Sequence, residues 1–171
     1  MTKLLQVGDE APNFDLASTE DVVLMLRDEV PRTPVLLYLF AGTESAARRA
    51  DLSALKAAFP RLTRRNVKVL GVSAATLDEL KGVQRDLALP FPLLHDDRNL
   101  AGAYGADWAE GDGDSAICVL VGRDQRVLWL ANPAPAAAEG VQAALGALPG
   151  ESSTANYPRK VINRLVDRWV N

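Results

Sequence analysis

The sequence has one cysteine and one histidine among its 171 residues. A single cysteine excludes a disulfide within the chain and a Cys-x-x-Cys exchange motif, and it fits a reducing compartment. A single histidine, His95, is too few for a His-rich metal site or for a histidine triad with a cysteine nucleophile nearby in sequence. We therefore expect no bound metal and no cofactor.

Long apolar runs and an excess of positive charge are also missing. The longest apolar run, VLLYLFAG, is far shorter than the roughly 20 residues of a membrane-spanning helix. A net charge of −3 argues against binding of nucleic acid, which requires a basic face. The first residues, MTKLLQVGDEAPNF, contain no apolar run followed by a small-residue cleavage site. We therefore expect no signal peptide and a cytoplasmic location.

The pattern of apolar residues predicts an α/β fold. Val35–Phe40 is continuously apolar and is typical of a strand buried on both faces, and Val67–Ser73 (VKVLGVS) is expected to be a second buried strand. A helix from about Glu44 to Phe59 lies between them, and Pro60 should end or kink it. Further elements are expected at Asp21–Arg27, Leu77–Leu87, Phe91–His95, Asn99–Tyr104, Ser115–Val121, Arg126–Ala131 and Glu139–Leu148. Early strand–helix–strand alternation and a late hairpin predict a mixed central sheet with helices on both faces, in one domain over residues 1–148.

Residues 149–171 are expected to form a polar linker and a C-terminal amphipathic helix. Apolar residues, among them Ile162, Leu165 and Trp169, fall on one helical stripe, and basic residues occupy most of the remainder. An isolated helix of this length is only marginally stable in water, so its apolar stripe should pack against another surface. The default is its own domain or a second subunit, which predicts a homodimer or a protein partner. A membrane surface is the less favoured alternative, because the stripe is short and rich in valine.

Several stretches resemble one family when they are taken in order. VGDEAPNFDLAST, VLLYLFAG, VKVLGVSAATLDEL, LALPFPLLHDDRNLAGAYGA and ICVLVGRDQRVLWL are similar to segments of peroxiredoxins of the AhpC/TSA and bacterioferritin-comigratory type. The likeness extends over about residues 7–148. It implies a thioredoxin-like fold with the N-terminal extension of the peroxiredoxins. It also implies a thiol peroxidase whose nucleophile lies in the first turn of the helix after the central strand.

The residues that the family's chemistry requires are not found at the matching positions. The usual motif is Pro-x-x-x-Thr-x-x-Cys, and Thr43 matches its threonine, but Ala46 stands where the cysteine should be. In the alternative register that position is Ser45. The motif's proline would fall on Leu39 or Tyr38, and the family's arginine, expected near Ala116, is absent from DSAICVLV. The resemblance therefore implies a vestigial pocket around these positions.

The expected N-terminus of the first long helix has two interpretations. Its backbone N–H groups at Gly42, Thr43, Glu44 and Ser45 would form an anion site, or the two hydroxyl residues simply cap the helix. Capping is favoured. The negative charge of Glu44 stabilises a helix N-terminus that carries no thiol, but it would raise the pKa of a thiol placed there. Leu52, Leu55, Phe59 and Leu62 form the expected core stripe of this helix, with Asp51 away from it and Arg48 and Arg49 on a solvated face.

Cys118 is the only thiol and leads to the main functional alternatives. In the strand AICVLV it is expected to be a small buried hydrophobe. As an alternative, it is a relocated nucleophile that shares a strand face with Ala116. The favoured hypothesis is a peroxiredoxin-like protein that is not a peroxidase and instead has a binding or regulatory role related to antioxidant defence. The alternatives are a thiol-dependent oxidoreductase that uses Cys118 and a structural module that dimerises through its C-terminal helix.

Overall fold

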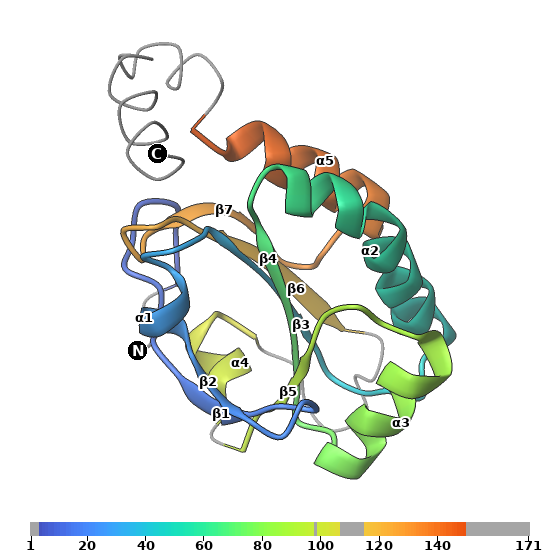
Figure 1. Ribbon diagram of the computed structural model, residues 1–171. Coiled ribbons are helices and arrows are strands. Elements are labelled where there is room, and N and C mark those ends of the chain that lie inside the picture. The colour runs from blue at the N-terminus through green and yellow to red at the C-terminus, as the bar shows by residue number, and fades with distance from the viewer. Residues whose placement is uncertain (1–3, 98, 107–114, 150–171) are drawn as a thin grey trace, which may run out of the picture.

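A five-stranded mixed sheet forms the centre of the molecule (Figure 1). The structure is a computed structural model that describes residues 4–97, 99–106 and 115–149. The strand order is β5-β4-β3-β6-β7, with β3, β4 and β5 parallel and β6 and β7 antiparallel to their neighbours. The strands are β3 (Val35–Phe40), β4 (Lys68–Ser73), β5 (Leu93–His95), β6 (Ala116–Val121) and β7 (Val127–Ala131).

Helices cover both faces of this sheet, which confirms the α/β prediction (Figure 1). One face packs against α2 (Ala46–Arg64), α3 (Leu77–Leu87) and α5 (Ala137–Ala147). The other face packs against α1 (Leu26–Glu29), α4 (Leu100–Ala103) and the hairpin of β1 (Asp15–Ala17) and β2 (Val23–Met25). Strands β3 and β6 are buried along their whole length, because every residue in them is apolar and both faces are covered.

The boundaries of several elements differ from the prediction. Helix α2 begins at Ala46 instead of Glu44, because Ser45 has extended backbone angles and its side chain accepts the N–H of Arg48. The helix also continues through Pro60 to Arg64, where Leu62 is fully buried in the core. The stretch predicted as Asp21–Arg27 is divided between β2 and α1. The predicted C-terminal helix lies outside the described residues.

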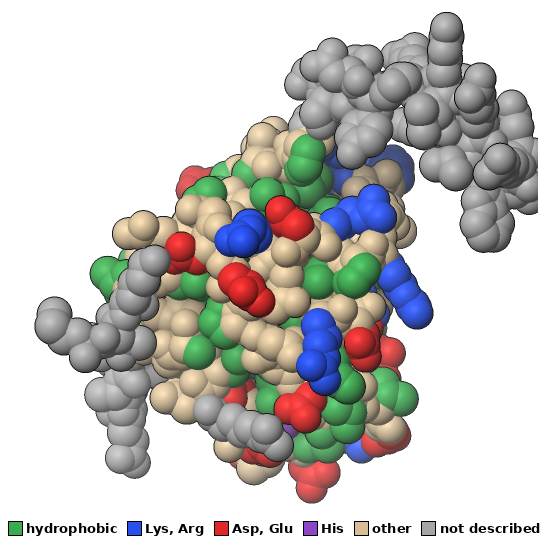
Figure 2. Space-filling model, turned by 90° about the vertical axis from the view of Figure 1, so that its left-hand side faces the viewer, with side chains coloured by type: hydrophobic (Ala, Val, Ile, Leu, Met, Phe, Trp, Pro, Cys, Tyr) green, Lys and Arg blue, Asp and Glu red, His purple; other side chains and the backbone are tan. Residues whose placement is uncertain are grey.

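Charge is unevenly distributed between the two ends of the sheet (Figure 2). In this view most Lys and Arg side chains lie in the upper half, and Asp and Glu side chains predominate towards the lower end. The upper end holds the amino ends of β3 and β4 and the carboxyl end of α2 (Figure 1). The lower end holds the carboxyl ends of the parallel strands and the N-terminus of α2, which is the end where α/β proteins commonly bind ligands.

Candidate functional site

The connection from β3 to α2 contains most of the predicted site. Thr43 is buried, and its carbonyl accepts the Nε–H of Arg49 at 2.9 Å. Ser45 is the N-cap of α2, and its hydroxyl accepts the N–H of Arg48 at 3.2 Å. Ala46 is the first helical residue and is exposed. The helix N-terminus therefore presents a serine cap and an alanine methyl group where the resemblance implies a cysteine.

A buried polar cluster lies under the first turns of α2. Tyr38 Oη donates to Asp51 Oδ2 at 2.8 Å, and Arg48 Nη2 lies 3.2 Å from the same oxygen. The other carboxylate oxygen, Asp51 Oδ1, accepts the N–H of Ala137 at 3.2 Å. The Asp51 side chain is 11% exposed and that of Arg48 is 13% exposed. This carboxylate therefore joins α2 to the central strand and caps the start of α5 from another helix.

The predictions for the polar residues of α2 need correction. Asp51 was expected away from the buried stripe, and Arg48 and Arg49 were expected on a solvated face. Asp51 and Arg48 instead form a largely buried ion pair, and Arg49 is half-buried against the Thr43 carbonyl. A signal for Asp51 was present, because it lies four residues before Leu55 on the same helical stripe. Nothing in the sequence indicates that Asp51 accepts a hydrogen bond from the first residue of α5.

Cys118 lies in the middle of β6 and is 5% exposed. It is directly opposite Tyr38 of β3 in the sheet register. Burial raises the pKa of the Cys118 thiol to about 12, and the negative charge of Asp51 adds to the effect, while an N–H bond from Val119 partly opposes it. At neutral pH the thiol is therefore protonated and shielded from solvent, which is the opposite of an activated nucleophile.

Ala116 is the first residue of β6 and lies opposite Phe40, at the end of the sheet where α2 begins. It shares the α2 face of the sheet with Cys118, as the alternation along the strand predicted. Its carbonyl accepts the N–H of Ala134 at 2.8 Å. The position where the resemblance implies an arginine therefore carries a buried methyl group, 2% exposed, and no positive charge.

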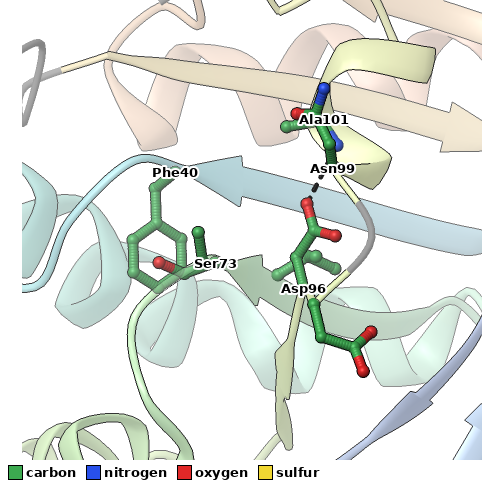
Figure 3. Close-up of a pocket in the computed structure, with 8 residues that line it drawn as sticks. Phe40, Ser73, Asp96, Asn99 and Ala101 are labelled. Atoms are coloured by element: carbon green, nitrogen blue, oxygen red, sulfur yellow. Dashed lines mark hydrogen bonds between the residues drawn. The ribbon is translucent and has the colours of Figure 1, made fainter. Parts of the chain in front are cut away.

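A separate cavity of about 180 Å³ lies at the carboxyl ends of β3, β4 and β5 (Figure 3). Phe40, Ser73, Asp96 and Asn99 are among the residues that line it. The carboxylate of Asp96 points towards α4 and accepts the N–H of Leu100 at 2.7 Å and that of Ala101 at 3.1 Å, so it serves as a cap for this short helix. Ser73 Oγ donates to the Ala41 carbonyl at 3.3 Å. The polar groups of this cavity are thus engaged in holding the loops.

Two further properties of the described ranges bear on function. No group of three or more His, Cys, Asp or Glu side chains in residues 4–97, 99–106 and 115–149 is placed to hold a metal ion. Within those same ranges no helix has the length and the apolar character needed to cross a membrane.

The chain and its fold are similar to known peroxiredoxins. The model of the AhpC/TSA family matches residues 7–133. Peroxiredoxin bcp of Coxiella burnetii is 28% identical over 102 residues, which are 59% of this chain and 67% of that protein.

Solved structures agree with the same fold. Peroxidoxin BcpB of Mycobacterium tuberculosis superposes with a TM-score of 0.76 at 15% identity, over 84% of this chain and 96% of that chain. A mutant of PrxQ from Xylella fastidiosa gives a TM-score of 0.73 at 16% identity, over 83% and 94% of the two chains. The family match spans well over half of the chain, so this protein belongs to the AhpC/TSA family and has the thioredoxin-like fold of the peroxiredoxins.

Proposed function

We propose that this chain is a member of the AhpC/TSA family that does not act as a thiol peroxidase and serves instead as a binding or regulatory protein. The observation that carries the proposal is the pairing of a cysteine-free helix N-terminus with a single thiol that is buried elsewhere. Ser45 and Ala46 occupy the start of α2, and Cys118 is 5% exposed in the middle of β6. Peroxide reduction by a protein thiol requires a thiolate that the peroxide can reach.

The electrostatics support the same conclusion. No cation is among the groups that shift the pKa of Cys118, and the Asp51 carboxylate moves that pKa upward. The guanidinium of Arg48 is paired with Asp51. With a pKa of about 12, only a minute fraction of Cys118 is thiolate at pH 7. A one-cysteine peroxidase centred on Cys118 therefore has neither the access nor the charge that it needs.

The binding role assigned to the helix N-terminus is a proposal as well. Gly42 and Ser45 are half-buried, Thr43 is buried and Glu44 is exposed, so parts of this connection at the carboxyl end of β3 are accessible to solvent. A small anion or a partner's carboxylate is the ligand that this end of a helix suits. Titration with phosphate and sulfate, followed by chemical-shift changes at Thr43 and Ser45, tests this part. Unchanged chemical shifts would contradict an anion site at this helix N-terminus.

Peroxide consumption tests the loss of peroxidase activity. We expect the wild type and Cys118→Ser to consume hydrogen peroxide and an organic hydroperoxide no faster than buffer with reductant. A cysteine-containing peroxiredoxin in the same assay serves as the positive control. Ala46→Cys and Ser45→Cys place a thiol at the helix N-terminus and show whether the remaining scaffold supports any reaction. Peroxide turnover by the wild type that Cys118→Ser abolishes would overturn the proposal.

A further inference from the structure

We draw no further inference here: the strongest candidate, the groove of about 250 Å³ that Leu24, Phe59 and Phe91 line beside the amino end of β4, is an apolar surface for which nothing in the described part of the chain shows what covers it.

Discussion

Replacement of Asp51 by alanine should destabilise the protein more than any other single change in the polar part of the core. Asp51 is 8% exposed and holds Tyr38, Arg48 and the N–H of Ala137. Its removal leaves a largely buried guanidinium without a counter-charge and leaves two donors without an acceptor. Loss of one partner from a buried ion pair costs about 3–5 kcal/mol, so we expect a loss of about 4 kcal/mol in the free energy of unfolding.

Urea unfolding followed by circular dichroism measures this loss. With a slope of about 2 kcal/mol per molar urea, the midpoint should fall by about 2 M for Asp51→Ala. Asp51→Asn keeps one acceptor and the shape of the side chain, so its loss should be smaller, about 1–2 kcal/mol. Asp86→Ala is the matched control, since Asp86 is an exposed aspartate on α3. A midpoint for Asp51→Ala equal to that for Asp86→Ala would refute the role given to this cluster.

Three other predictions concern the Ser45 cap of α2, the Cys118 thiol and the C-terminal residues 151–171. Ser45→Ala removes the acceptor for the Arg48 N–H and should cost about 1 kcal/mol in urea unfolding, whereas Ser53→Ala on the exposed side of α2 should cost much less. Burial raises the pKa of Cys118 from 9.0 to about 12, so its contribution to stability is complete below about pH 9 and declines as the pH rises towards 12. The free energy of unfolding should therefore fall over that window, and it should fall less in Cys118→Ala. Deletion of residues 151–171 should move a dimer to the monomer position in size exclusion if the C-terminal segment drives dimerisation, and an unchanged position would contradict that role.

The central strands could be predicted because the pattern of apolar residues within each strand is enough to indicate it. Val35–Phe40 is a continuous apolar run and Val67–Ser73 is rich in valine and leucine, and the structure has strands at Val35–Phe40 and Lys68–Ser73. The shared face of Ala116 and Cys118 follows from the two-residue period of a strand. These inferences need only local sequence, which explains why they agree with the structure.

The features that were missed depend on contacts between distant segments. Helix α5 begins at Ala137, two residues before the predicted start, because Asp51 accepts the Ala137 N–H from another helix. A local reading of the Ala- and Pro-rich linker cannot show that bond. The strand β1 was not predicted, because only three residues form it and only the middle one, Leu16, is buried.

The most direct test of the central claim is the oxidation of the native protein by hydrogen peroxide in the presence of dimedone, which traps a cysteine sulfenic acid. Intact-mass measurement reports the adduct, and protein unfolded in urea serves as the control in which Cys118 is accessible. We predict no adduct on the native chain and an adduct on the unfolded chain. Trapping of Cys118 in the native chain, faster than in the unfolded one, would contradict the proposal that this member of the AhpC/TSA family does not act as a thiol peroxidase.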